Sequence, residues 1–143
     1  MVVRCAKCGV GNKIHPDADG KTPVCGRCKT PLATGLTIPV TVTDTTFAEA
    51  VEKSTLPVLL DMWAAWCGPC RIIAPTVAAL AAELSGRVLV AKLDVDTNQR
   101  TAARFGVQSI PTLLILKSGR EVGRIVGVQS KESILRQLAP HIA

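Results

Sequence analysis

The chain has 143 residues and a mass of 15.1 kDa, which suffice for one ordinary domain and a small appendage. Hydrophobic residues make up 48% and charged residues 20% of the chain, as in globular proteins and unlike disordered or collagen-like chains. No uninterrupted apolar stretch approaches the roughly 20 residues of a membrane-spanning helix. The first residues also lack the apolar stretch of a secretory signal, so we expect a cytoplasmic protein without membrane attachment.

The net charge of +6 is concentrated near the N-terminus, where residues 1–36 carry six basic and two acidic side chains. A basic segment could contact nucleic acid, but this one contains none of the chain's Phe or Trp residues, on which bases would stack. Thiolates around a zinc ion would also offset part of its positive charge. We therefore do not expect nucleic acid among the partners.

Two Cys-x-x-Cys pairs, sixteen residues apart, lie in this segment. Such pairs are typical of a tetrahedral zinc site, in which each pair forms a tight turn that presents both sulfurs to the metal. Because the segment has few apolar residues, a bound metal would supply the free energy that orders it. Residues 1–32 are therefore predicted to be a small zinc-ribbon-like module, with the ligands Cys5, Cys8, Cys25 and Cys28. Two labile disulfides, or a second redox pair, are the alternative.

Residues 33–37 are predicted to be a linker, and residues 38–143 a domain in which strands and helices alternate. Apolar or β-branched runs predict strands at 38–43, 57–63, 87–94, 112–116 and 121–126. Apolar stripes at helical spacing predict helices at about 44–54, 67–84, 99–105 and from Ser130 onward, the first of them capped by Asp44 or Thr46. This order predicts an α/β fold, with helices around a central mixed sheet that ends in an antiparallel hairpin.

The third cysteine pair, Cys67-Gly68-Pro69-Cys70, follows a predicted strand and opens a predicted helix. The unpaired N–H groups of a helix N-terminus favour negative charge, and here they favour the thiolate of Cys67. Two intervening residues leave the second sulfur close enough to form a disulfide. A further zinc half-site is the alternative, but no other Cys-x-x-Cys pair or nearby His completes it.

Over about residues 38–143 the sequence resembles the thioredoxin family, and the resemblance implies the thioredoxin fold. It rests on Trp66-Cys67-Gly68-Pro69-Cys70, on Asp61-Met62-Trp63 ahead of this motif, on Ile110-Pro111-Thr112, and on Gly127 after the last strand. The N-terminal cysteine pairs resemble the zinc-binding thioredoxin 2 subclass. Met62 replaces a frequent aromatic residue, and Arg71 replaces a frequent lysine but keeps its positive charge.

The resemblance implies a protein-disulfide reductase that serves redox homeostasis in the cell. Cys67 would attack the substrate disulfide to form a mixed disulfide, and Cys70 would resolve it. Asp61 lies in an apolar strand, where burial should raise its pKa and suit it to accept the proton of Cys70. Lys92 occupies the family's matching lysine position, and a purely structural Asp61–Lys92 pair is the alternative role.

The resemblance also implies a cis peptide bond before Pro111 and a flat apolar surface around Cys67 for flexible protein substrates. This surface would consist of Trp66, Gly68, Pro69, Ile110, Pro111, Val126 and Gly127. We expect a monomer whose partners are disulfide-containing proteins and an NADPH-dependent thioredoxin reductase. Zn²⁺, in a structural or regulatory role, is the expected cofactor, with no bound organic cofactor.

Two other functions are weighed against disulfide reduction. An oxidase or isomerase would run the same chemistry in the opposite direction, but strongly oxidising relatives tend to carry a histidine where this chain has Gly68-Pro69. The N-terminal cysteines suggest instead a zinc-dependent redox sensor or holding chaperone, in which oxidation releases zinc.

Overall fold

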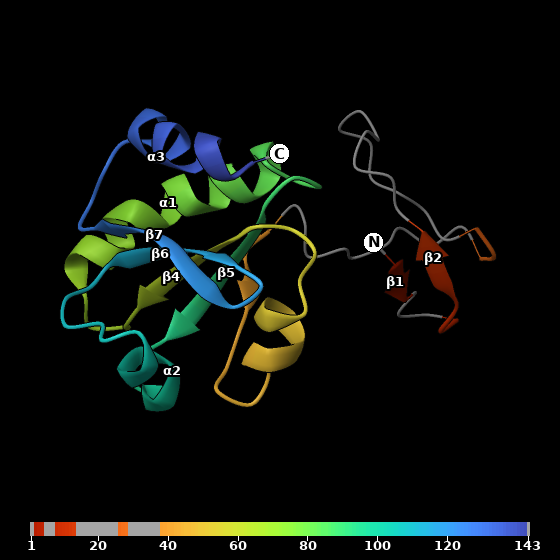
Figure 1. The fold of residues 1–143 in the computed structure, drawn as a ribbon, viewed down its shortest axis with the longest axis horizontal. Helices are drawn as coiled ribbons and strands as arrows, with labels where there is room; N and C mark the ends of the chain where they lie inside the picture. The colour runs from red at the N-terminus through yellow and green to blue at the C-terminus, as the bar shows by residue number, and fades with distance from the viewer. Residues whose placement is uncertain (1, 5–7, 14–25, 29–37, 143) are drawn as a thin grey trace.

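The computed structural model describes residues 2–4, 8–13, 26–28 and 38–142. Residues 38–142 contain a five-stranded mixed sheet with the strand order β3-β5-β4-β6-β7 (Figure 1). The strands are β3 (Val40–Thr41), β4 (Val58–Trp63), β5 (Leu89–Asp94), β6 (Thr112–Lys117) and β7 (Arg120–Val126). The helices are the π-helical turn η1 (Ala48–Glu52), α1 (Gly68–Glu83), α2 (Gln99–Arg104), α3 (Lys131–Leu138) and the short 3-10 helix η2 (Ala139–His141). The predicted mixed α/β fold is therefore confirmed.

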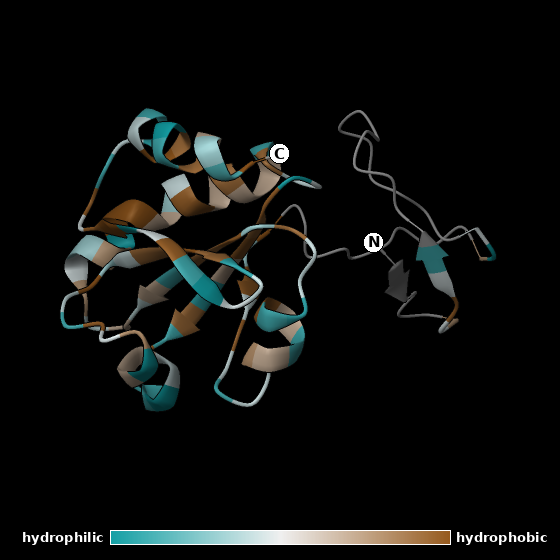
Figure 2. Cartoon of the chain, viewed as in Figure 1, coloured by the Kyte–Doolittle hydropathy of each residue, from teal (hydrophilic) through white to brown (hydrophobic). Residues whose placement is uncertain are grey.

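The central strand β4 pairs in parallel with β5 and antiparallel with β6, so both of its edges are hydrogen-bonded to other strands. Its side chains alternate between two cores, because successive residues of a strand face opposite sides of the sheet. Leu59 packs with apolar residues of α1 and α3, whereas Leu60 and Met62 pack with those around η1. Figure 2 shows hydrophobic residues concentrated on the central strands and along α1. The continuous apolar run of β4 follows from this burial on both faces.

The hairpin between β6 and β7 is tighter than the sequence predicted. Both strands extend to the turn, with Lys117 opposite Arg120, and only Ser118 and Gly119 connect them. These two residues have φ values of 52° and 80°, the left-handed pair that a two-residue hairpin turn requires. β7 stays paired with β6 as far as Val126, which lies opposite Thr112, although the register shifts by one residue between Leu116, opposite Glu121, and Ile115, opposite Gly123.

The predicted caps of the first helix are wrong, because Asp44 and Thr46 bond elsewhere. η1 begins after Phe47 without a side-chain cap, and the Thr46 hydroxyl accepts the Thr43 N–H at 2.8 Å. The Asp44 carboxylate instead accepts the N–H of Thr101 at 2.9 Å and its hydroxyl at 2.7 Å, and so caps α2. The Thr101 hydroxyl bond is the main reason that the pKa of Asp44 is lowered. By contrast, Ser130 caps α3 as predicted, since its hydroxyl accepts the Ser133 N–H.

In the N-terminal segment, the short strands β1 (Val2–Arg4) and β2 (Gly11–Lys13) pair antiparallel. The side chain of Asn12 in β2 accepts the N–H of Gly26 at 3.0 Å, which connects β2 to the turn at 26–28. The predicted linker at 33–37 lies outside the described residues. No helix in the described part of the chain is long and apolar enough to cross a membrane.

We predict that Asp44→Ala lowers the melting temperature by several degrees, since it leaves the first N–H groups of α2 without their acceptor. Asp44→Asn keeps one acceptor oxygen and should cost less. Thermal unfolding followed by circular dichroism would measure both variants. Equal melting temperatures for wild type and Asp44→Ala would contradict this long-range cap.

Candidate functional site

A disulfide between Cys67 and Cys70 lies at the start of α1, with the two Cα atoms 5.3 Å apart. Cys67 is the residue that caps the helix, and its Sγ accepts the backbone N–H of Cys70 at 3.2 Å. The strand-to-helix junction predicted for this pair is therefore present. An N–H group aimed at the sulfur stabilises negative charge on it, so the helix start favours the Cys67 thiolate once the disulfide is reduced.

Both cysteines are almost enclosed, at 3% and 4% exposure, so burial does not distinguish their roles. They form a small cluster with Ala64, against which Trp63 and Ile110 pack. The Ile110 carbonyl oxygen lies 3.7 Å from Cys67 Sγ, and the bond from Ile110 to Pro111 is cis, as predicted. The position at the helix start, rather than exposure, makes Cys67 the candidate nucleophile.

Apolar side chains lie exposed around this disulfide. Trp66 is 70% and Val126 52% exposed, and Gly68 and Pro69 are exposed at the first turn of α1. The Gly127 N–H donates to the Pro111 carbonyl at 2.9 Å, so the end of β7 lies directly beside the cis peptide bond. The structure thus brings the two ends of the predicted apolar surface toward the same edge of the sheet.

Two residues of this region were missed in the sequence. The carboxylate of Asp96 accepts the indole N–H of Trp66 at 2.9 Å, and Ile72 on α1 is 67% exposed. Asp96 follows β5, which runs parallel to β4, and parallel strands end at the same edge of a sheet. That topology was a usable signal for Asp96. Ile72 gave none, because an exposed apolar residue on a helix is common.

Asp61 lies on β4, is 1% exposed, and faces the same side of the sheet as Leu59, the side covered by α1. Burial raises its pKa to about 6, although the positive charge of Lys92 opposes this rise. Lys92 is its neighbour on β5, but the ammonium lies 4.9 Å over the Trp63 ring, and neither Asp61 oxygen accepts a hydrogen bond from the described residues. Among the described residues, the buried carboxyl group therefore has no hydrogen-bonded partner, the Lys92 ammonium included.

The predicted zinc ligands are only partly described. Cys8 and Cys28 lie half-buried in turns, and Cys5 and Cys25 lie outside the described residues. Within the described ranges, no three His, Cys, Asp or Glu side chains gather into a metal site. Because half of the predicted ligand set lies outside these ranges, the zinc site stays a prediction.

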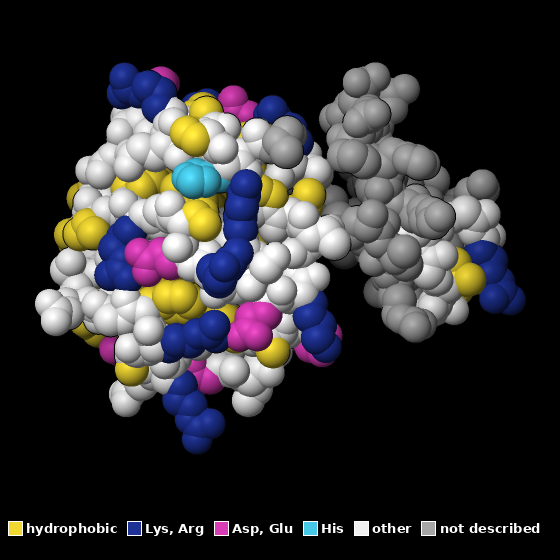
Figure 3. Space-filling view, in the orientation of Figure 1, with side chains coloured by type: hydrophobic (Ala, Val, Ile, Leu, Met, Phe, Trp, Pro, Cys, Tyr) yellow, Lys and Arg dark blue, Asp and Glu magenta, His cyan; other side chains and the backbone are white. Residues whose placement is uncertain are grey.

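Charged side chains show no basic stripe of the kind that binds nucleic acid on the face seen in Figure 3, where Lys and Arg lie among Asp and Glu. Most of the basic N-terminal segment lies outside the described residues, so the absence of nucleic acid from the partners stays a prediction.

Comparison with known proteins places the domain. The thioredoxin family model matches residues 38–140. A thioredoxin of Mycobacterium tuberculosis is 51% identical over 100 residues, which cover 70% of this chain and 86% of that protein. Thioredoxin 1 of a Nostoc species is 44% identical over 101 residues, 71% of this chain and 94% of its own length. A bifunctional thioredoxin reductase/thioredoxin of Mycobacterium leprae is 46% identical over 102 residues, 71% of this chain and 22% of its length.

We predict that Asp61→Asn stabilises the protein at alkaline pH and not at acid pH. Between pH about 4 and about 6 the folded protein keeps a proton on Asp61 that the unfolded chain has lost, so the stability of the wild type falls as pH rises through this range. Asparagine does not ionise, so the variant should be more stable than wild type by up to about 3 kcal/mol at pH 8.

Urea unfolding at pH 4, 6 and 8 would measure the free energies of both proteins. The difference should be small at pH 4 and grow with pH. A difference that is the same at all three values would show that the carboxyl group titrates normally.

Proposed function

The chain belongs to the thioredoxin family and is a thiol–disulfide oxidoreductase that reduces protein disulfides, and we propose that Cys67 and Cys70 carry the reaction. The observation that carries this assignment is the disulfide at the start of α1, where the Cys70 N–H points at Cys67 Sγ. It joins the two sulfurs whose oxidation and reduction the activity requires.

The reaction transfers two electrons by two exchanges of sulfur–sulfur bonds. The Cys67 thiolate attacks one sulfur of the substrate disulfide, whose bond breaks as a mixed disulfide forms and the other substrate sulfur leaves as a thiolate. The Cys70 thiolate then attacks Cys67 Sγ, the mixed disulfide breaks, and the Cys67–Cys70 disulfide forms. The substrate leaves as a dithiol with the two electrons, and a reductase returns two electrons to the pair.

Asp61 is proposed to accept the proton that Cys70 loses in the second exchange, directly or through water. With a pKa raised to about 6 by burial, the carboxyl group is largely ionised at neutral pH and can still take up a proton. Its place on the side of β4 that α1 covers, and the absence of a hydrogen bond to it from any described residue, support this role. Lys92 would act on Asp61 by limiting the rise of its pKa.

Protein substrates are proposed to bind in extended form on the predicted apolar surface, in which Trp66, Gly68, Pro69 and Val126 are exposed, Ile110 and Gly127 are half-buried, and Pro111 is buried beneath them. The exposure of Trp66 and Val126 supports this, as does the Ile110 backbone beside Cys67 Sγ, where a substrate segment could pair by adding a strand. Such a surface suits many flexible protein segments rather than one small molecule.

Family membership implies a thioredoxin reductase as the electron donor, and we propose that it draws electrons from NADPH. The name of the Mycobacterium leprae relative joins both activities in one chain. We further propose that the protein acts as a monomer in the cytoplasm.

The N-terminal segment is proposed to be the zinc module of the thioredoxin 2 subclass, with Cys5, Cys8, Cys25 and Cys28 as ligands. Cys8 lies in the connection between β1 and β2, and the side chain of Asn12 in β2 accepts the N–H of Gly26, two residues before Cys28. This contact supports an approach of the two pairs, and four thiolates are a donor set that suits Zn²⁺. If oxidation released this zinc, the module would serve as a redox sensor or holding chaperone beside the reductase activity.

We predict that Cys67→Ser lowers reduction of insulin disulfides to the background rate of dithiothreitol alone, because no thiolate remains to attack the substrate. Cys70→Ser should instead trap substrate proteins in a mixed disulfide, which non-reducing electrophoresis would show. Turnover by Cys67→Ser, or trapping by Cys67→Ser and not by Cys70→Ser, would reverse the assignment.

For the N-terminal module we predict about one zinc ion per chain, measured by elemental analysis of freshly purified, reduced protein. Cys25→Ser should lower the zinc content while leaving insulin reduction within about twofold of wild type, because the disulfide of the domain does not involve this residue. Reduced wild-type protein without zinc would contradict the zinc module. A loss of reductase activity in Cys25→Ser that matches its loss of zinc would show that the reductase activity depends on the module.

A further inference from the structure

The loop between α2 and β6, residues 105–111, forms one edge of the site, because its Ile110 carbonyl lies 3.7 Å from Cys67 Sγ. Two hydrogen bonds hold the C-terminal part of this loop. The Thr112 hydroxyl donates to the Ser109 carbonyl at 2.6 Å, and the Gly127 N–H donates to the Pro111 carbonyl at 2.9 Å.

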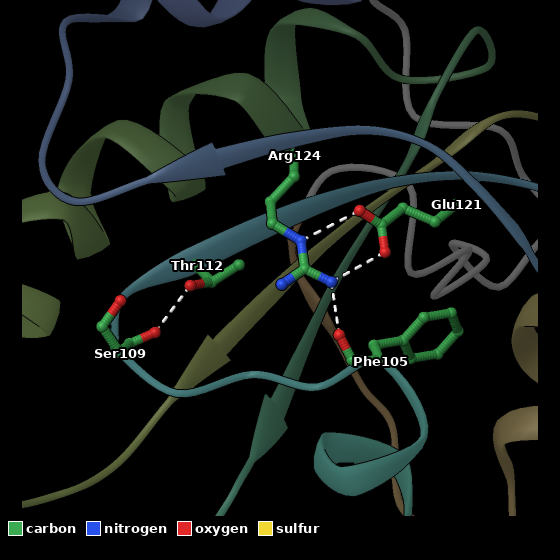
Figure 4. Close-up of polar contacts among 5 residues, drawn as sticks. All are labelled: Phe105, Ser109, Thr112, Glu121 and Arg124. Carbon is green, nitrogen blue, oxygen red and sulfur yellow. Dashed lines mark hydrogen bonds and ion pairs between the residues drawn. The ribbon is translucent and has the colours of Figure 1, made fainter.

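The beginning of the loop is held by a side chain from β7. The guanidinium of Arg124 donates to the carbonyl oxygen of Phe105, the C-cap residue of α2 (Figure 4). The same guanidinium donates from Nε and Nη2 to the two carboxylate oxygens of Glu121, at 2.9 and 2.8 Å. A two-point contact of this kind fixes the plane of the guanidinium group, and with it the direction of the bond to Phe105.

Phe105 is thereby fixed from two sides. Its ring packs on Phe47, with the ring centroids 5.7 Å apart, and the guanidinium of Arg104 lies 5.1 Å over it. Arg124, which lies on β7, holds the backbone of Phe105 through the Phe105 carbonyl oxygen. The Arg124 and Glu121 side chains are 30% and 31% exposed and their contact lies at the surface, so its value comes from the two-point geometry rather than from burial.

The loop is therefore clamped at both ends from β7 and the residue after it, by Arg124 at Phe105 and by Gly127 at Pro111. The Ile110 backbone lies between these two points. A change in the direction of the backbone after Phe105 would displace the Ile110 backbone, with which the substrate is proposed to pair. The disulfide at the start of α1 would stay in place.

We propose that Arg124 is a positioning residue for protein substrates, which holds the 105–111 loop through the Phe105 carbonyl so that the Ile110 backbone stays beside Cys67. This inference rests on the proposed function, since it assumes that an extended substrate pairs with the loop. A small disulfide needs only the Cys67 sulfur, so Arg124 should affect protein substrates and small disulfides differently.

The test compares wild type with Arg124→Met, Arg124→Lys and the control Arg120→Met, an exposed arginine of the same strand beside the hairpin turn. KM and kcat are measured for insulin with dithiothreitol as the reductant. The rate with 5,5′-dithiobis(2-nitrobenzoic acid) is measured for the reduced proteins, and amide hydrogen exchange is measured across the domain.

For Arg124→Met we expect a rise of about fivefold in KM for insulin, a typical effect of losing one charged hydrogen bond that orients a binding edge, with kcat and the small-disulfide rate within about twofold. The amides of Val107 and Gly127 should exchange faster, and those of α1 should not. Arg124→Lys should recover part of the KM, because an ammonium can still donate to Phe105, and Arg120→Met should behave as wild type.

Equal losses with insulin and with the small disulfide, or an unchanged KM, would overturn the proposal, as would the same KM rise in Arg120→Met. If the wild-type protein failed to reduce insulin, the proposed function would fail instead. The exchange rates would then decide alone whether Arg124 holds the loop, and unchanged rates at Val107 and Gly127 would reject it.

Discussion

The chemistry of this protein depends on one contact, the N–H of Cys70 directed at the sulfur of Cys67 where α1 begins. A helix leaves its first N–H groups without backbone partners, and here a sulfur atom occupies the place that a serine or aspartate oxygen usually takes. The residue that caps the helix is thereby also the residue that carries the negative charge. Pro69 lies in the first helical turn, where its missing N–H costs nothing.

The sheet explains why the other parts of the site meet at this point. β4 and β5 run in parallel, so the connections that follow them, which carry Trp66 and Asp96, leave the same edge. β6 runs antiparallel to β4, so the segment before β6 arrives at that edge with Ile110 and Pro111. The directions of the strands therefore bring residues that are far apart in the sequence to the same edge of the sheet, and loop contacts adjust their final positions.

The spacing of apolar residues and the Cys67–Cys70 motif predicted most of the domain. β4, β5 and α1 are buried by the rest of the fold, and the spacing of their apolar residues in the sequence indicates which of their faces are buried. The cap of α2 by Asp44 could not be predicted in this way, because the donor and acceptor are 57 positions apart in the sequence. For the same reason, the Arg124–Phe105 contact became apparent only in three dimensions, since it depends on the register of β7 against β6. The cysteine motif, by contrast, is local and was read directly.

Asp61 shows that the site and the stability of the fold make opposite demands on one position. Asp61 is 1% exposed on the side of β4 that also carries the fully buried Leu59, and an apolar residue of similar size would satisfy that environment better than a carboxyl group. Burial raises the pKa of Asp61 to about 6. Above pH 6 the carboxyl group is mostly ionised, and its negative charge then lies in the protein interior, where it is poorly solvated. A nearby ammonium on Lys92 reduces this cost without removing it, because it lies over the Trp63 ring rather than in contact with the carboxylate. A carboxyl group kept at the expense of folding free energy, on the side of the sheet that α1 covers, is what a proton acceptor for a buried thiol requires.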